Sequence, residues 1–227
     1  MTTPRACCGP LNEQVSEIVV QSKNIRWQPG LITRAEREAA RGHRGVLVWL
    51  TGLPGSGKST IASAVEHVLI ERGVAAYVLD GDNIRHGLSS DLGFSPEDRR
   101  ENIRRIGEVA KLFVDAGVVV LCAFVSPYRK DRETLRESAG KRDFIEIHVR
   151  ASLETCRARD PKGLYGKAAS GLIEDLTGVG SPYEPPEHPE LVLDTEVDEP
   201  EASVARVIRL LEERGDVQES IEPRPGC

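Results

Sequence analysis

The sequence has 227 residues, 39% of them hydrophobic, which suits one α/β domain with tails or two small domains. Its formal net charge of -6 argues against a nucleic-acid-coating surface, because phosphate contacts need an excess of basic residues. The five cysteines lack the spacing of a zinc site or a disulfide framework, and no signal peptide or membrane span is recognisable. We therefore expect a cytoplasmic protein without nucleic-acid or membrane partners.

The chain divides into three predicted parts. Residues 1–24 are polar and poorly patterned, and we predict a flexible N-terminal tail there. Residues 25–214 are predicted to form one domain, and 215–227 a C-terminal tail. Near the start of the domain, Thr33 is the expected N-cap of a short charged helix.

Within the domain, apolar runs of strand length alternate with helical stretches. The predicted strands are 46–51, 75–80, 118–124, 144–149 and 191–193. The predicted helices are 58–71, 96–116, 129–138, 153–159 and 201–214. Near-continuous apolar strands separated by helices indicate an α/β fold with a doubly wound parallel sheet. In such a fold, ligands bind at the carboxyl ends of the strands.

One segment breaks this alternation. Residues 160–190 contain many Gly and Pro and no long helical pattern. A long irregular stretch inside a compact domain is usually functional, and we predict a lid loop there.

The strongest motif is G-x-x-x-x-G-K-S at 52–59, which follows the first predicted strand and opens a helix. The glycines let the backbone N–H groups point at phosphate oxygens, and the helix N-terminus attracts negative charge. In this motif Lys58 contacts the β- and γ-phosphates and Ser59 binds Mg²⁺. The predicted ATP-binding residues are Gly52, Pro54, Gly55, Ser56, Gly57, Lys58, Ser59 and Thr60.

Two carboxylates follow the second predicted strand. Asp80 and Asp82 lie at its carboxyl end, on the side where the phosphate-binding loop opens. We expect Asp82 to accept or orient the proton of the attacking hydroxyl, and Asp80 to help hold Mg²⁺ through water. The alternative is that Asp-Gly-Asp-Asn is only turn chemistry.

Two polar side chains are predicted to face inward from the helix that Ser95 caps. Arg99 and Asn102 fall on its apolar stripe, near its N-terminal end. An inward arginine needs an anionic partner, and its planar guanidinium suits phosphate or sulfate. Arg85 is a second candidate for the same anion. The alternative is that Arg99 lies in solvent where the helix protrudes past the core.

These pieces, in this order, resemble the adenylylsulfate kinase family of P-loop NTPase-like proteins over about residues 24–212, in its stand-alone bacterial form. The segments that carry the resemblance are GLPGSGKS at 52–59, DGDNIR at 80–85, DLGFSPEDRRENIRRIGEVAKLFVDAG at 91–117, FVSPYRKDRE at 124–133, RDPKGLYGKA at 159–168 and LTGVGSPYEPPEHPEL at 176–191.

The resemblance implies ATP- and Mg²⁺-dependent phosphorylation of the 3′-hydroxyl of adenosine 5′-phosphosulfate (APS), in sulfate activation. It implies that Phe94 stacks on the substrate adenine, that Arg99 and Asn102 hold its phosphosulfate and ribose, and that Lys162 closes over the phosphates. The implied APS-binding residues are Asp82, Asn83, Ile84, Arg85, Phe94, Arg99, Asn102, Val125, Ser126, Lys162, Leu164 and Leu176.

The implied catalytic residues are Asp82, Lys58 and Ser126. For Ser126 the resemblance suggests a phosphoserine intermediate; we favour direct in-line transfer, because a base and a positioned acceptor suffice. The resemblance also suggests a homodimer, with the segment near Trp27 reaching a partner or the active site, and functional coupling to ATP sulfurylase.

The sequence departs from the family pattern in the lid. Leu176 stands where the family often has Phe, which would remove one aromatic face from the adenine site at a cost of about 1 kcal/mol. Gly180 replaces a usual Asp, and Gly166 and Ala169 replace common basic residues. These changes bear on affinity more than on reaction type. The alternatives left open are a P-loop kinase of another small anionic nucleotide and a nucleotide-binding regulatory partner without turnover.

Overall fold

The computed structural model describes residues 25–26 and 28–218. The predicted tail at 1–24, most of the predicted tail at 215–227 and Trp27 lie outside the described residues. The chain separates into two units, residues 1–31 and 32–227, and the helices and strands of the described residues all lie in the second. The domain limits of 25–214 stay a prediction.

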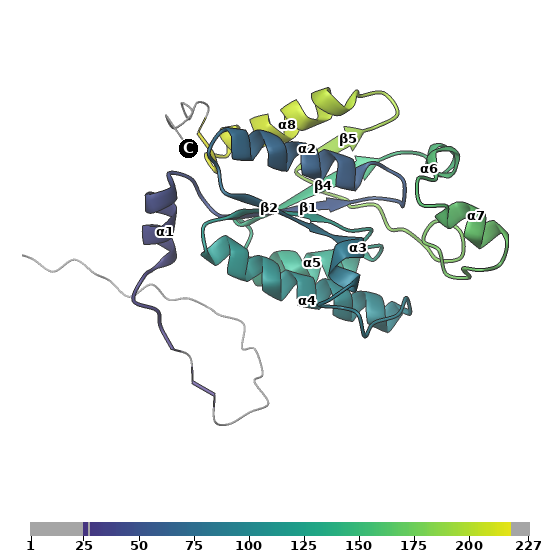
Figure 1. Cartoon of the computed structure of the whole chain (residues 1–227), viewed down its shortest axis with the longest axis horizontal. Helices are drawn as coiled ribbons and strands as arrows, with labels where there is room; N and C mark the ends of the chain where they lie inside the picture. Colours follow the sequence, from purple (N-terminus) through teal and green to yellow (C-terminus); the bar gives the residue numbers. More distant parts are fainter. Residues whose placement is uncertain (1–24, 27, 219–227) are drawn as a thin grey trace, which may run out of the picture. The chain divides into compact units, whose positions relative to one another are not determined.

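The centre of the domain is a five-stranded sheet in the order β2-β3-β1-β4-β5 (Figure 1). Every pairing is parallel, and β1 in the middle pairs with β3 on one side and β4 on the other. The strands are β1 Val46–Thr51, β2 Ala76–Asp80, β3 Val119–Ala123, β4 Phe144–Arg150 and β5 Leu191–Asp194. The predicted parallel α/β sheet is confirmed, and no strand boundary differs from the prediction by more than one residue.

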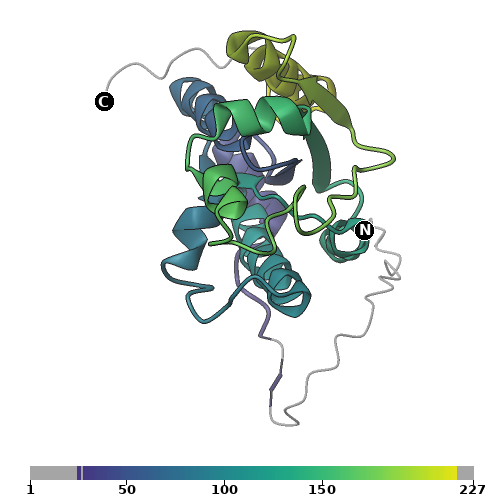
Figure 2. The same cartoon turned by 90° about the vertical axis from the view of Figure 1, so that its right-hand side faces the viewer.

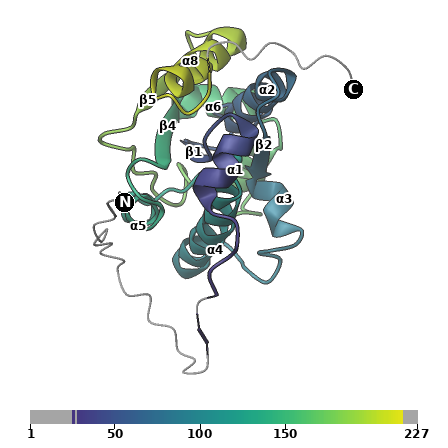
Figure 3. The same ribbon diagram turned by 90° about the vertical axis from the view of Figure 1, so that its left-hand side faces the viewer.

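Helices cover both faces of the sheet. In two views α2 and α8 lie on one face, and α4 and α5 on the other (Figures 1 and 3). The helices are α1 Arg34–Arg41, α2 Lys58–Glu71, α3 Gly81–Arg85, α4 Pro96–Asp115, α5 Arg129–Ala139, α6 Leu153–Arg159, α7 Leu164–Ala169 and α8 Pro200–Glu213. The short helices α3 and α7 were not predicted. No helix in the described part of the chain is long and apolar enough to cross a membrane.

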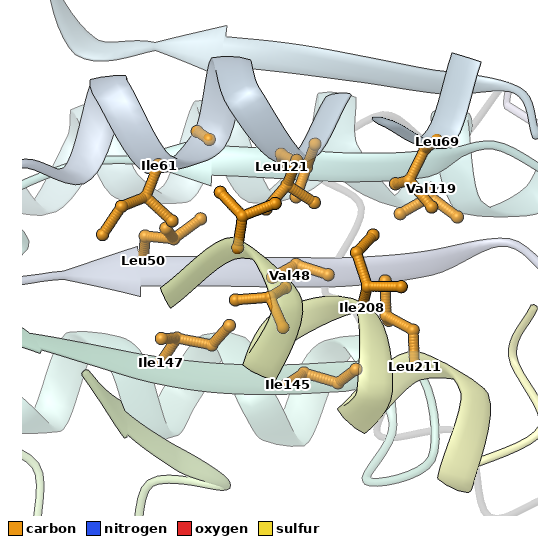
Figure 4. Packing of buried hydrophobic residues seen from close by; sticks show 14 of the residues in the cluster. Val48, Leu50, Ile61, Leu69, Val119, Leu121, Ile145, Ile147, Ile208 and Leu211 are labelled. Atoms are coloured by element: carbon orange, nitrogen blue, oxygen red, sulfur yellow. The ribbon is translucent and has the colours of Figure 1, made fainter. Parts of the chain in front are cut away.

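The core consists of two apolar layers because alternate residues of each strand point to opposite faces. One layer packs the sheet against α2 and α8, with Val48, Leu121 and Ile208 at its centre (Figure 4). The other packs the sheet against α4 and α5 around Trp49, whose ring stacks on Phe124 at 5.3 Å between centroids. These layers fix the strand ends from which the site is built.

Two helix starts follow their sequence signals. The Thr33 hydroxyl accepts a hydrogen bond from the Glu36 N–H, and the Glu36 carboxylate accepts one from the Thr33 N–H, which completes a capping box. The hydroxyl of Ser95 caps α4 at the N–H of Asp98, with Pro96 in the first turn. Both predicted N-caps are confirmed.

The lid segment contains α7 and an irregular stretch as far as β5. Helices α6 and α7 lie at the end of the sheet where the strands terminate, which is turned toward the viewer in Figure 2. Residues from this segment therefore reach the carboxyl edge of the sheet, where ligand sites of this architecture form.

Candidate active site

A cavity of about 1220 Å³ opens at the carboxyl edge of the sheet. It is lined by the phosphate-binding loop, the end of β2, the start of α4, the segment after β3, the lid and the segment after β5. The predicted site residues that line it are Pro54, Gly55, Gly57, Lys58, Ser59, Thr60, Asp80, Asp82, Arg85, Phe94, Arg99, Asn102, Val125, Ser126, Lys162, Leu164 and Leu176. Gly52, Ser56, Asn83 and Ile84 lie outside this lining; Ser56 is buried, Asn83 is exposed and Ile84 packs on the core layer of Trp49.

The phosphate-binding loop connects β1 to α2 through a backbone path that needs glycine. Gly55 and Gly57 adopt φ angles of 80° and 99°, in the left-handed region that other residues avoid. Lys58 is buried, and its Nζ donates to the carbonyl oxygens of Gly52 at 2.9 Å and Leu53 at 2.7 Å. Burial lowers the pKa of Lys58 to about 8. The ammonium group of Lys58 is thus held by the backbone of the loop that lines the cavity.

Two oxygens suited to a divalent cation meet beside this lysine. The Ser59 hydroxyl donates a 2.6 Å hydrogen bond to Oδ2 of Asp80. The other carboxylate oxygen of Asp80 accepts from the N–H of Asp82 at 3.0 Å and caps α3. The described residues contain no cluster of three or more His, Cys, Asp or Glu side chains arranged to hold a metal. A cation here would need phosphate oxygens or water to complete its coordination.

The carboxylate of Asp82 lies at the first turn of α3 and faces the lid. It forms an ion pair with the ammonium group of Lys162, and both side chains are more than half exposed. A carboxylate from the sheet edge and an ammonium group from the lid thus share one wall of the cavity.

The other half of the cavity contains an aromatic ring and an unpaired amide. Phe94 is 62% exposed, and the guanidinium of Arg85 lies over its ring at 4.3 Å from the centroid. One face of the ring is therefore covered by a cation and the other is open to a ligand. Asn102 is buried, and its Oδ1 has no hydrogen-bond partner within the protein. A buried acceptor of this kind lacks a donor that a ligand can supply.

Arg99 faces the lid from the first turn of α4, on the inward side as predicted. It donates to the hydroxyl of Thr177 at 2.6 Å, to the carbonyl oxygen of Asp175 at 2.6 Å and to that of Phe94 at 2.8 Å. The expected anionic partner is not among them; all three are neutral oxygens. Arg99 therefore joins α4 to the lid as well as lining the cavity.

The segment after β3 forms one wall of the cavity. Ser126 has a φ of 40°, in the left-handed region that is strained for a non-glycine residue. Its hydroxyl accepts from Nε1 of Trp49 at 3.0 Å and donates to Oγ1 of Thr51 at 2.9 Å. Its carbonyl oxygen accepts from the buried guanidinium of Arg132 at 2.6 Å. The hydroxyl is thus engaged with the protein interior.

The lid has a small apolar core of its own, in which Leu176 is buried with Cys156 and Tyr165. Leu176 therefore offers little free surface for stacking. Gly180 lies so close to residue 174 that an added Cβ would be 1.9 Å from the carbonyl oxygen of Glu174. The backbone of the lid turn in this chain requires glycine at that position.

The cavity also includes residues that the sequence analysis missed. Arg159 at the end of α6 donates to the hydroxyl of Thr195 at 2.9 Å and to its carbonyl oxygen at 2.5 Å. Val197 is 79% exposed, and the buried hydroxyl of Ser203 has no partner within the protein. These residues lie on α6 and after β5. The sequence could have pointed to those after β5, because residues that follow the strands of such a sheet line its ligand crevice.

The family model and the curated relatives agree on one family. Residues 44–194 match the family model described as adenylylsulphate kinase. An adenylyl-sulfate kinase from Geotalea uraniireducens is 58% identical over 84% of this chain and 92% of its own length. Another from Staphylococcus carnosus is 53% identical over 86% of this chain and 98% of its own length. The structure of the Mycobacterium tuberculosis APS kinase CysC in complex with AMPPNP and APS aligns with a TM-score of 0.71 and 48% identity, over 75% of this chain and 99% of that one.

Proposed function

This chain belongs to the adenylylsulfate kinase family, and from that membership and the two-sided cavity we infer its reaction. It transfers the γ-phosphate of ATP to the 3′-hydroxyl of APS, which yields 3′-phosphoadenylylsulfate and ADP. The observation that carries this conclusion is that the phosphate-binding loop with Lys58 and the carboxylate of Asp82 open into one cavity.

ATP is the phosphate donor. Its triphosphate would lie on the backbone N–H groups of residues 52–59, with Lys58 beside the β- and γ-phosphates. The buried, unpaired hydroxyl of Ser203 and the exposed side chain of Val197 support a site for the adenine base of ATP after β5, beside Arg159.

Mg²⁺ fits the oxygen pair of Ser59 and Asp80, because hard oxygen donors only 2.6 Å apart line the cavity next to the phosphate-binding loop. These two residues would hold the ion, in part through water. When bound, Mg²⁺ neutralises charge on the β- and γ-phosphates.

The acceptor nucleotide would occupy the other half of the cavity. The open face of Phe94 suits an adenine ring, and the unpaired Oδ1 of Asn102 suits a ribose hydroxyl donor. Arg85 and Arg99 supply positive charge for the phosphosulfate. The remaining proposed contacts are the predicted ones at Asn83, Ile84, Val125, Leu164 and Leu176.

The transfer itself needs a base and alignment. The Asp82 carboxylate takes the proton of the 3′-hydroxyl as that oxygen bonds to the γ-phosphorus. The bond between this phosphorus and the β–γ bridging oxygen breaks, and ADP leaves with the electron pair. Lys162, now paired with Asp82, would turn to the transferring phosphoryl group. Ser126 needs no covalent role, since its hydroxyl already holds Trp49 and Thr51.

Further proposals rest on the family resemblance. We propose that the protein is a cytoplasmic homodimer and that it takes its substrate from an ATP sulfurylase. Sedimentation of the purified chain tests the dimer. The coupling is tested by comparing two assays at the same APS concentration, one in which a sulfurylase makes the APS and one in which free APS is added. Coupling predicts faster product formation in the first.

The competing activity is phosphorylation of another adenine nucleotide such as AMP. A competition assay with ATP, Mg²⁺ and equal concentrations of APS and AMP decides between them. We expect APS to be phosphorylated and AMP to remain. Phosphorylation of AMP would favour the alternative kinase, and binding of both nucleotides without any product would favour a regulatory protein.

A further inference from the structure

The lid is fastened to the phosphate-binding loop by a tyrosine. The phenol of Tyr165, in the first turn of α7, donates a 2.9 Å hydrogen bond to the carbonyl oxygen of Pro54. The two residues are 111 positions apart in the sequence. Pro54 is next to Leu53, whose carbonyl oxygen accepts from Nζ of Lys58. The tyrosine therefore bonds to the same short stretch of backbone that holds the phosphate-binding lysine.

The ring of Tyr165 is fixed by its surroundings. It is 7% exposed and lies in the apolar core of the lid with Cys156 and Leu176, against which Leu53 of the phosphate-binding loop also packs. A tyrosine hydroxyl is already protonated at neutral pH, and burial raises the pKa of Tyr165 further, so this group is a hydrogen-bond donor. A buried ring with one bonded hydroxyl fixes both the position and the direction of the contact.

The segment just before Tyr165 is fixed as well. The two carboxylate oxygens of Asp160 accept from the N–H groups of Tyr165 at 3.1 Å and Gly166 at 3.0 Å. Asp160 has a φ of 22°, a value that is strained for a residue other than glycine. Lys162 lies between Asp160 and Tyr165 in the sequence, and its ammonium group reaches Asp82.

We propose that Tyr165 is a positioning residue that ties the lid to the phosphate-binding loop, so that the conformation of the loop determines where Lys162 meets the acceptor side. This inference rests on the proposed kinase function and assigns to it a link between the ATP and APS halves of the site. ATP that orders the loop would thereby order the lid and bring Lys162 to the transferring phosphoryl group.

The test is Tyr165→Phe, which removes only the hydroxyl. We expect about a three- to tenfold loss in affinity for AMPPNP, measured by calorimetry, and a similar loss in kcat, because one buried hydrogen bond is lost. The KM for APS should rise less than the affinity for AMPPNP falls, because the hydrogen bond that is lost ends on Pro54 of the phosphate-binding loop and APS is reached only through Lys162.

Tyr183→Phe is the matched control. Tyr183 is a partly buried tyrosine whose hydroxyl lies 3.1 Å from Oγ1 of Thr51, and it is outside the cavity lining. A purely structural role predicts that both variants lower the melting temperature alike and leave AMPPNP affinity and kcat unchanged; that result would overturn the proposal.

A double-mutant cycle sharpens the link to Lys162. If Tyr165 acts by placing Lys162, then Tyr165→Phe should cost much less kcat in a Lys162→Ala background than in the wild-type protein. Fully additive losses would contradict the link. Two measurements show the effect of Tyr165→Phe without depending on catalysis: the affinity for AMPPNP and the rate at which trypsin cleaves the lid. A wild-type protein that forms no product would therefore remove the kinase function alone, whereas unchanged affinity and cleavage in Tyr165→Phe would remove this inference alone.

Discussion

The hydroxyl of Ser59 donates a 2.6 Å hydrogen bond to Oδ2 of Asp80, which joins the first turn of α2 to the end of β2. This contact brings the phosphate-binding loop and the acidic strand end together. The second oxygen of Asp80 caps α3 at Asp82. One carboxylate thus connects the proposed metal-binding hydroxyl to the helix that carries the proposed base.

Asp80→Asn should raise the Mg²⁺ concentration that gives half-maximal activity by about tenfold. Substitution of a residue that orients a metal site typically lowers the affinity for the metal by 10- to 100-fold. The amide retains an oxygen for the Asp82 N–H, so α3 should persist. Titration of activity with Mg²⁺ measures the effect, and Asp91→Asn, outside the cavity, is the control. An unchanged Mg²⁺ requirement would exclude Asp80 from the metal site.

Ser126→Ala separates direct transfer from a phosphoserine intermediate. Direct transfer predicts that kcat stays within about tenfold of the wild type, whereas a covalent route predicts its loss. Removal of the hydroxyl leaves Nε1 of the fully buried Trp49 unpaired, so the free energy of unfolding should fall by about 1–3 kcal/mol. Steady-state kinetics and chemical denaturation give the two readouts. Complete inactivation of a folded variant would favour the phosphoserine.

His148 on β4 should make stability fall between about pH 7 and pH 5. Burial, with Arg132 and Arg150 nearby, lowers the pKa of His148 to about 4, below the ordinary 6.5. The unfolded chain therefore takes up a proton first, and stability that is present above pH 6.5 is lost as the pH falls toward 4. Allowing for partial exposure of the ring, we expect a loss of about 1 kcal/mol.

Chemical denaturation of the wild type and of His148→Phe at pH 7 and at pH 5 measures this loss. The variant should show a smaller pH dependence, and replacement of the exposed His67 by Gln should leave it unchanged. Equal pH dependence in all three proteins would mean that His148 does not titrate in this way.

Gly180→Ala should disturb the lid. The added Cβ would lie 1.9 Å from the carbonyl oxygen of Glu174, and backbone atoms cannot move aside as a flexible side chain can. The neighbouring Leu176–Thr177 stretch carries the contact with Arg99, so we expect the KM for APS to rise several-fold. Gly87→Ala, where an added Cβ meets open space, is the control. An unchanged KM would show that the turn adapts.

The sheet and the phosphate-binding loop could be predicted because their signals are local. The apolar strands are continuous, and the motif at 52–59 joins a strand to a helix as it requires. The N-caps Thr33 and Ser95 likewise act within four residues. Helix α3 was missed because Asp-Gly-Asp-Asn also favours a turn, and the cap at Asp80 that starts the helix is visible only in the structure.

The remainder of the site depends on partners distant in sequence. Arg132 looks like one charge among many on a solvated helix, yet it is 1% exposed because Glu146, Ser126 and Glu184 surround its guanidinium. The burial of Leu176 in the lid core is equally a tertiary effect. Local patterns predict which elements form, whereas these contacts arise only once the chain has folded.

The central claim is that Asp82 activates the 3′-hydroxyl of APS for attack on ATP bound at Lys58. The most direct measurement incubates the wild type and Asp82→Asn with ATP, Mg²⁺ and APS, and identifies the phosphorylated position by ³¹P NMR, with AMPPNP affinity measured alongside. We predict 3′-phosphoadenylylsulfate and ADP from the wild type, and a rate about 10²- to 10⁴-fold lower from the variant at unchanged nucleotide affinity. Phosphate at another position, or an Asp82→Asn variant that turns over at the wild-type rate, would contradict the account.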